Sequence, residues 1–490
     1  MASVYSGHAI ATKAVAHLIN RISDQTPVAD SLFERAAAWF IRQQQRDGRQ
    51  LELEQQILLC EKRQAECSRG QQADIKRLLD DAHSQIETLQ QQQQEDAATL
   101  TIWFRALVHD ILTLCHGDNT EDTLNASARV LGTIQLLSPT EGKYIAEVNS
   151  RHRHLYKAVL SLRLLDQQLK DGQLQDSYIL ERYNASKAGP PSADNHYFSF
   201  YDDVQVPLVM ASLLQDIGSV HPDGLAILTG ADGKANPLRP LDNEQRTELL
   251  KVFFRECLSF AQKALVAARY MGRDRHERDC FVRNEEQKKA FLLKLLRFSF
   301  KSNEEIGSLL KIPQIYTAFV LSTKEQYQYE QLPKVGILLQ KGVDKGMYHA
   351  SSVTGLIKVT GHFPQGFGVV YVPKDSDGND LERYEYAIVT GLCPKDPEQP
   401  VCRLVTYSMT FKMSVHGMVL SKANNLYYPE GRKKLATVSE ERLLEILERL
   451  VSNFEERKNM PLLPQYWLPN DYFSVSRNQN LWNKVVNQHI

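Results

Sequence analysis

The sequence predicts a mainly α protein with N-terminal helices and a coiled coil, a central all-α bundle, and a small C-terminal antiparallel β region followed by a helix. Three observations support this fold class. Apolar residues recur at helical spacing through most of the chain before Gly361, and a Gln-rich stretch within that part repeats them in a 4-3-4-3 pattern. Beyond Gly361 apolar residues alternate with polar ones, which is typical of short strands.

Composition limits the classes of protein to which the chain can belong. With 490 residues, 42% hydrophobic and 24% charged, it is globular and long enough for two or three folded units. A formal net charge of −1 gives no general attraction to nucleic acid, so we expect no nucleic-acid partner. No stretch approaches the roughly 20 apolar residues that a membrane span needs, so we expect a cytoplasmic protein without membrane insertion.

The N-terminal part predicts helices and then a coiled coil. Ala14, Leu18 and Ile22 fall at helical spacing within the first 45 residues. In the Gln-rich stretch that follows, the apolar seam consists of Ile75, Leu79, Ala82, Ile86 and Leu89. Such a seam joins two helices, either in a dimer or in a hairpin within one chain, so we expect self-association or a helical protein partner.

Shifts in composition and pattern divide the chain into consecutive segments. The expected segments are N-terminal helices 1–45, Gln-rich coiled coil 46–99, helical bundle segment 100–183, linker 184–195, helical domain 196–365, and β region with helix and tail 366–490. The alternating pattern predicts strands at Phe367–Val372, Tyr384–Thr390, Val401–Tyr407 and Val415–Leu420. A wide apolar face predicts one more helix over Glu440–Glu456.

The most informative segment is 209–218, where an apolar helix leads into Gln215 and Asp216, followed by Ile217 and Gly218. It resembles the signature of HD-domain metal phosphohydrolases, in which adjacent His and Asp residues are followed by Ile-Gly-Lys. In that family the His and Asp hold a divalent metal that converts a bound water into hydroxide. In this sequence Gln215 stands at the His position, and a neutral carboxamide is a poorer ligand than imidazole.

A second stretch extends the resemblance to the HD-GYP branch of that family. Residues 341–361, followed by Phe-Pro-Gln-Gly at 363–366, resemble the end of an HD-GYP domain, where a helix precedes a Tyr-Pro-x-Gly turn and a small β-hairpin. The resemblance spans roughly residues 200–410. It implies an HD-like helical bundle and a role in bacterial cyclic-dinucleotide signalling.

Departures from the HD-GYP pattern fall on the metal ligands. The family's Val-Ala-Asp-x-Tyr-Asp-Ala stretch resembles residues 312–318, which places Gln314 and Thr317 where two Asp residues would lie. The family's His-His-Glu loop is matched only by residues 275–279. The ligand positions that the resemblance leaves intact are Asp216, His276 and Asp279.

Two functional hypotheses follow from this resemblance. The first is a non-catalytic signalling or regulatory protein with a decayed HD-GYP domain, which acts through nucleotide sensing or protein interaction. It expects no catalytic residue and no cofactor, with Gln215 and Asp216 as remnants of a lost site. The alternative is a divergent metal-dependent cyclic di-GMP phosphodiesterase, with Fe or Mn as the divalent ion. Its metal ligands would come from Asp216, His221, His276 and Asp279.

A basic segment is the candidate for binding an anionic ligand such as a cyclic dinucleotide, because Arg forks phosphates through two N–H groups. The candidate ligand-binding residues are Arg273, Arg275, His276 and Arg278. Lys288 and Lys289 extend the cluster, but interleaved acids such as Glu285 fit a solvated helix with ion pairs equally well. We interpret His152 and His154 as the exposed polar side of another helix.

Overall fold

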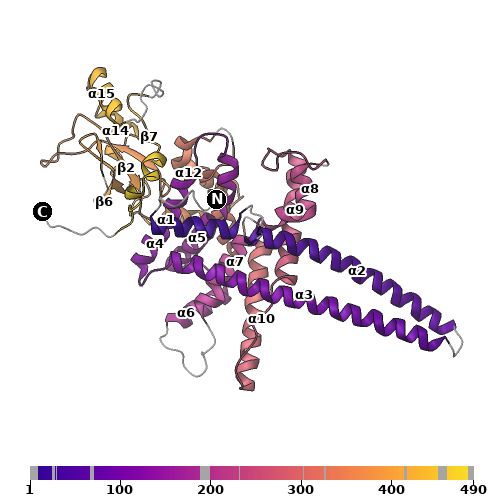
Figure 1. Cartoon of the computed structure of the whole chain (residues 1–490). Helices are drawn as coiled ribbons and strands as arrows, with labels where there is room; N and C mark the ends of the chain where they lie inside the picture. Colours follow the sequence, from indigo (N-terminus) through magenta and orange to yellow (C-terminus); the bar gives the residue numbers. More distant parts are fainter. Residues whose placement is uncertain are drawn as a thin grey trace. The chain divides into compact units, whose positions relative to one another are not determined.

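The computed structural model describes residues 9–24, 28, 30–66, 71–187, 199–230, 232–301, 303–324, 327–412, 417–450 and 461–483. This described part is mainly helical with a small antiparallel sheet near its C-terminal end, which confirms the predicted fold class (Figure 1). Contacts group the chain into two compact units. Unit 1 draws on residues 1–20, 109–184 and 298–490, and unit 2 on residues 21–108 and 185–297. The division into six consecutive segments stays a prediction.

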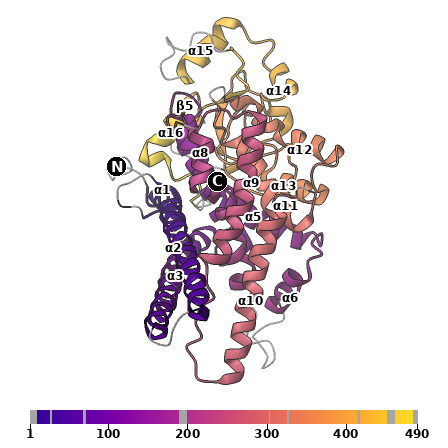
Figure 2. The same cartoon turned by 90° about the vertical axis from the view of Figure 1, so that its right-hand side faces the viewer.

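Unit 2 contains a long antiparallel hairpin made by α2 (Leu32–Glu66) and the first part of α3 (Gln72–Cys115), which lie side by side in Figures 1 and 2. Ala82 of the predicted seam is buried, and the other four seam residues are each only partly exposed. Leu53 and Cys60 of α2 are buried as well. Arg46 pairs with Asp96 across the hairpin. The seam therefore joins two helices of the same chain, which decides between the two arrangements that the sequence leaves open.

The rest of unit 2 consists of shorter helices around an aromatic core. Trp39 and Phe40 of α2 contact Phe260, with ring centroids 6.4 Å and 5.5 Å from it. Burying these rings stabilises the packing of α2 against the helix that carries Phe260. The remaining elements are η1 (Tyr201–Gln205), α7 (Val206–Leu214), η2 (Ile217–Val220), α8 (Pro222–Thr229), α9 (Asn243–Lys263) and α10 (Arg275–Phe298).

Unit 1 is organised around α5 (Ile145–Lys170), whose residues from 154 to 165 are all buried. His152 and His154 are 5% and 9% exposed, so their interpretation as an exposed side of a helix is wrong. A central helix is enclosed on all sides, which a helical period alone does not reveal. The other helices of unit 1 before the sheet are α1 (Ile10–Ile22), α4 (Thr120–Leu137), α6 (Ser177–Lys187), α11 (Glu305–Val320), α12 (Val335–Asp344) and α13 (Ala350–Thr360).

The C-terminal part of unit 1 contains a five-stranded antiparallel sheet of order β6-β3-β2-β1-β7. Its strands are β1 (Gly368–Tyr371), β2 (Glu385–Val389), β3 (Val401–Leu404), β6 (Gly417–Val419) and β7 (Tyr466–Trp467). Strands lie in all four predicted regions, but the third region is divided between β3 and β4 (Thr406–Tyr407), which pairs with β5 (Thr410–Phe411) in a separate two-stranded sheet. Residues 415–416 of the fourth region lie outside the described part. The strand β7 was not predicted because two residues show no alternation. The predicted C-terminal helix is α15 (Glu440–Leu450), and residues 451–456 lie outside the described part.

One helix in the described part of the chain, α3, contains a stretch that is long and apolar enough to cross a membrane. Within this stretch 44% of the residues are buried in the structure. Core helices of water-soluble proteins pass the same test. The expectation of no membrane insertion therefore stays a prediction. Of the linker expected at 184–195, residues 184–187 belong to α6 and the others lie outside the described part.

Candidate functional site

The motif at residues 209–218 lies where α7 ends. All nine residues of α7 are buried, as expected for a helix that is hydrophobic on every side. Gln215 follows it and is 2% exposed, and no described residue donates a hydrogen bond to its Oε1. A carboxamide oxygen carries only a partial negative charge, so this position is a weak metal ligand even though it is well buried.

Two glycines explain why the turn after the motif is tight. A Cβ on Gly218 would lie 2.9 Å from Cα of Phe253, on α9. A Cβ on Gly224 would lie 2.1 Å from the carbonyl oxygen of Gly218. Both positions require glycine because backbone approaches backbone there. The Ile-Gly part of the motif therefore has a packing role that is independent of any metal.

Three potential metal ligands converge directly after this turn. Their ligating atoms, from His221, Asp223 and Glu256, lie within 4.8 Å of one another. The His221 imidazole Nδ1 accepts a hydrogen bond from the backbone N–H of Asp223 at 3.1 Å, and its Nε2 lies 3.7 Å from Oε2 of Glu256. Of these three residues, only His221 was predicted from the sequence. Asp223 was close enough in sequence to be noticed, whereas Glu256 comes from α9 and is brought there by the fold.

Arg255 forms ion pairs with both carboxylates of this group. Its guanidinium pairs with Glu256 and with Asp223. The hydrogen bond to Glu256, above all, raises the pKa of Arg255 above its ordinary value. A guanidinium and a divalent ion would compete for the same carboxylate oxygens. The single positive charge of Arg255 thus offsets part of the negative charge of the two carboxylates.

Asp216 belongs to no group of three or more potential ligands among the described residues, and neither do His276 and Asp279. Burial, with the negative charge of Asp216 as a smaller cause, raises the pKa of the Cys257 thiol to about 12. Asp216 therefore lies near Cys257, a fully buried residue of α9. The four-ligand set of the phosphodiesterase alternative, Asp216 with His221, His276 and Asp279, is not brought together in the structure.

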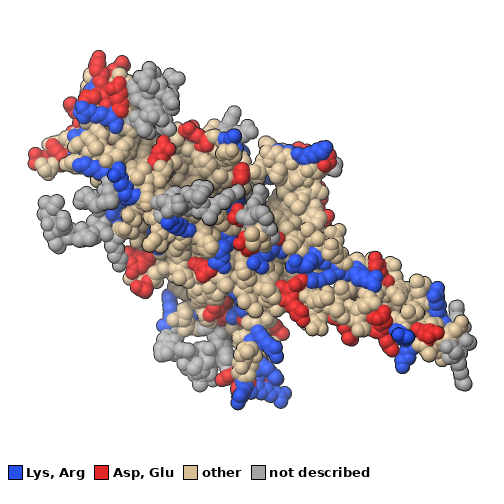
Figure 3. Space-filling view, in the orientation of Figure 1, with Lys and Arg blue, Asp and Glu red and all other residues tan. Residues whose placement is uncertain are grey.

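The expected anion-binding residues are exposed side chains at the start of α10. Arg273 and Arg275 carry no ion pair in the described part, while Arg278 Nε lies 3.5 Å from Oδ1 of neighbouring Asp279. The Nδ1 atom of His276 lies 3.9 Å from Sγ of Cys280, one turn along the same helix. Figure 3 shows Lys and Arg side chains gathered at this end of α10. The segment is a solvated basic surface rather than an enclosed site.

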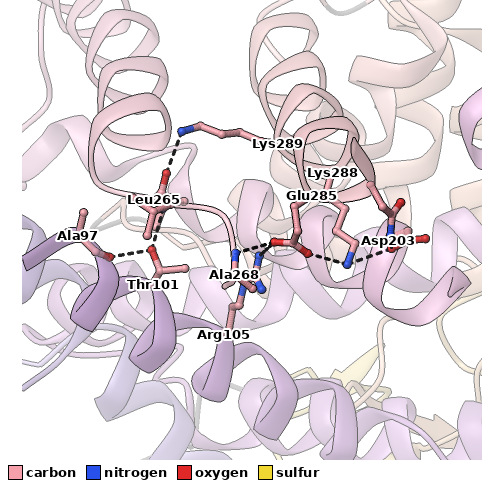
Figure 4. A network of polar contacts seen from close by, with 11 residues as sticks. Ala97, Thr101, Arg105, Asp203, Leu265, Ala268, Glu285, Lys288 and Lys289 are labelled. Atoms are coloured by element: carbon pink, nitrogen blue, oxygen red, sulfur yellow. Dashed lines mark hydrogen bonds and ion pairs between the residues drawn. The ribbon is translucent and has the colours of Figure 1, made fainter. Parts of the chain in front are cut away.

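Lys288 and Lys289 do not extend that basic surface. Lys288 is part of a buried network with Glu285 and Asp203, at 2.9 Å and 3.1 Å from their carboxylate oxygens (Figure 4). Glu285 also accepts hydrogen bonds from Arg105 at 2.7 Å and from the backbone N–H of Ala268 at 2.8 Å. Burial raises the pKa of Glu285, but these donors outweigh it and the net pKa is lowered. This network ties α3, η1 and α10 together.

The two positions where the family has further Asp ligands do not supply charge. Thr317 is 1% exposed, and its Oγ1 has no hydrogen-bond partner among the residues described. Gln314 Oε1 lies 3.4 Å from the ammonium group of Lys311. A hydroxyl and a carboxamide cannot replace two carboxylates in a two-metal centre. The residues present therefore do not fit the metal centre that the resemblance implies.

The chain matches no protein-family model, and searches of curated proteins and of solved structures give no match. Function is therefore inferred from the residues and their geometry.

Proposed function

We propose that the chain is a non-catalytic signalling or regulatory protein with a decayed HD-GYP domain, which acts by sensing a cyclic dinucleotide or by protein interaction. One observation supports this above all. The guanidinium of Arg255 lies on Asp223 and Glu256, the two carboxylates that accompany His221 beside the motif. A fixed positive charge at that place opposes a divalent cation. The neutral side chain of Gln215 adds to the loss of metal affinity.

The proposal predicts the metal content and the activity of the purified protein. We expect no stoichiometric iron or manganese by elemental analysis and no turnover of bis-p-nitrophenyl phosphate or cyclic di-GMP. The variant Arg255→Gln frees the two carboxylates, so we expect it to bind Mn²⁺ at least about tenfold more tightly than the wild type, by roughly 1.4 kcal/mol. The matched control is Arg278→Gln, an exposed arginine outside the group, which should leave Mn²⁺ binding unchanged.

A second candidate function is favoured by the same group of residues. A His with two carboxylates is a ligand set typical of divalent metal sites, and Fe or Mn held there would support phosphodiesterase chemistry. Stoichiometric metal in the wild type, with turnover abolished by Glu256→Gln and by His221→Ala, would establish this enzyme and remove the non-catalytic proposal. Calorimetry with cyclic di-GMP then tests the sensing role, and loss of binding in Arg275→Gln would place the ligand at the start of α10.

The hairpin of α2 and α3 supports the interaction role, and we commit to a second copy of this chain as its partner. Leu51 and Leu58, one heptad apart on α2, are 56% and 52% exposed although the seam of the hairpin is satisfied internally. Exposed leucines at heptad spacing are typical of a further helical interface. Arg outnumbers acidic residues in the N-terminal half of α2 and Glu prevails in the C-terminal half. Two antiparallel copies would therefore bring opposite charges together.

This pairing predicts a concentration-dependent dimer. Light scattering coupled to size exclusion should give a dimer mass for the wild type and a monomer mass for Leu51→Ser combined with Leu58→Ser. Both side chains lie on the solvent side of α2, so circular dichroism should show unchanged helicity. Leu78→Ser, an exposed leucine on α3 with 47% exposure, serves as the comparison for a leucine outside the α2 stripe. A monomeric wild type at about 100 μM would contradict self-association and leave a different helical protein as the partner.

A further inference from the structure

A cavity of about 600 Å³ lies in unit 1, between the first half of α4 and the sheet. Its lining comes from α4 with the residue before it, from the residues after β2, from β3 and from residues 482–483, all of which belong to this unit. Small-molecule sites in proteins enclose roughly 300–1,000 Å³. The cavity is therefore large enough for a small organic ligand.

The wall formed by α4 carries negative charge. Four of its lining residues fall at helical spacing, namely Glu121, Leu124, Asn125 and Ala128. The side chain of Glu121 is exposed, and no described residue forms an ion pair or a hydrogen bond with its carboxylate. Asp122 also lines the cavity, but its carboxylate accepts a hydrogen bond from Nδ2 of Asn119 at 2.8 Å. The Glu121 carboxylate is thus open to a positively charged group of a ligand.

The wall formed by β3 carries positive charge. Arg403 lines the cavity, and its Nη2 donates a hydrogen bond to the backbone carbonyl of Asn483 at 2.6 Å. This bond holds the guanidinium in place at the wall. Burial lowers the pKa of Arg403, but a guanidinium stays protonated at pH 7. A ligand in the cavity therefore meets a permanent positive charge on this side.

Two neighbouring carbonyl groups relate the positions of these charges. Asn125 Nδ2 donates to the carbonyl oxygen of Trp482 at 3.1 Å, and Arg403 donates to that of Asn483. The amide of Asn125 and the guanidinium of Arg403 therefore lie beside adjacent peptide groups. Glu121 precedes Asn125 by one helical turn, with about 5–6 Å between Cβ atoms. The negative and the positive group are thus separated by about one to two helical turns, roughly 5–11 Å.

The remaining lining is largely apolar and firmly built. Leu392 and Val401 line the sheet side, and Leu124 and Ala128 line the helix side. The indole Nε1 of Trp482 donates to the carbonyl of Thr390 at 2.9 Å, and a Cβ on Gly132 of α4 would lie 2.2 Å from the Trp482 ring. The tryptophan is therefore held between α4 and the end of β2. An apolar lining with a few fixed polar groups is typical of ligand sites.

We propose that this cavity binds a short apolar peptide with free termini, in its simplest form a dipeptide. The ammonium group pairs with Glu121 and the carboxylate with Arg403, and both are charge-assisted hydrogen bonds. An extended dipeptide spans about 7 Å, which matches the separation of the two charges, whereas a single amino acid carries both groups on one Cα. The cavity belongs to unit 1 and the motif to unit 2, so this site goes beyond the proposed function.

Isothermal calorimetry on the full-length protein tests the proposal, with the dipeptide Leu-Leu as the probe. We expect Leu-Leu to bind. N-acetyl-Leu-Leu, which lacks the ammonium group, and Leu-Leu amide, which lacks the carboxylate, should each bind at least about tenfold more weakly. Free leucine should also bind more weakly. The absence of binding up to about 10 mM Leu-Leu, or equal affinity for Leu-Leu and its doubly capped analogue, would overturn the proposal.

Two variants assign the binding to this cavity. Glu121→Gln should weaken the binding of Leu-Leu severalfold and leave that of N-acetyl-Leu-Leu unchanged, because the capped peptide has no charge for position 121. Arg403→Gln should weaken the binding of Leu-Leu at least about tenfold and leave that of Leu-Leu amide unchanged. Glu141→Gln, an exposed acid elsewhere in unit 1, should bind Leu-Leu as the wild type does.

The exposed side chain of Glu121 keeps the test decisive if Arg403→Gln does not fold. Loss of affinity in Glu121→Gln for Leu-Leu alone supports the site by itself. Binding of Leu-Leu that Glu121→Gln leaves unchanged places the peptide elsewhere and contradicts the site.

Discussion

Gly224→Ala is expected to lower the free energy of unfolding by about 3 kcal/mol, at the upper end of what overpacking normally costs. The added methyl group would lie 2.1 Å from the carbonyl oxygen of Gly218, and that atom belongs to the backbone, which cannot turn away as a flexible side chain would. Relief of the clash must separate α8 from the turn after the motif. Urea unfolding followed by circular dichroism measures the loss.

The matched control for this substitution is Gly48→Ala. Gly48 lies inside α2, and nothing lies within 4 Å of the position that its Cβ would take. Alanine is a better helix former than glycine by about 0.5–1 kcal/mol, so this variant should be slightly more stable than the wild type. A Gly224→Ala protein as stable as Gly48→Ala would mean that the approach of Gly224 to Gly218 is not tight in solution.

Glu285→Ala is expected to destabilise unit 2 by about 3 kcal/mol, as loss of one member of a buried charge network does. Glu285 is 2% exposed and accepts from Arg105, Lys288 and the backbone N–H of Ala268. Without the Glu285 carboxylate, the Lys288 ammonium retains its ion pair with Asp203. The backbone N–H of Ala268 loses its hydrogen-bond acceptor. Urea unfolding should show the loss, and Glu286→Ala, an exposed neighbour on α10, should change stability by less than about 0.5 kcal/mol.

The same network has a defined pH dependence. The pKa of Glu285 is lower in the folded protein than its ordinary value of 4.5, so the unfolded chain binds the proton more tightly. The stabilisation is therefore fully present above pH 4.5 and is lost as pH falls through the folded pKa. The stability difference between wild type and Glu285→Gln should shrink in that acidic range. A difference that stays constant down to pH 3 would show that the charge of Glu285 contributes nothing.

The sequence by itself determined the class of each element. A 3.6-residue period, a 4-3-4-3 seam and an alternation of period two each reflect one local face, and faces are properties of consecutive residues. For this reason the sequence predicted the helices before Gly361, the seam at Ala82 and the strand regions that contain β1, β2 and β3. That position 215 carries a neutral carboxamide is likewise a matter of residue identity. It could be recognised without coordinates.

Only the tertiary structure decided which groups face one another. The seam has the same pattern in a dimer and in a hairpin, and chain folding selected the hairpin. Lys288 was predicted beside an exposed basic cluster but lies in the buried network, because Asp203 compensates its charge from 85 positions earlier in the chain. Arg255 pairs with both Glu256 and Asp223, one of which lies 32 positions earlier in the chain. Charge compensation depends on distances between residues far apart in sequence, and periodicity carries no information on those distances.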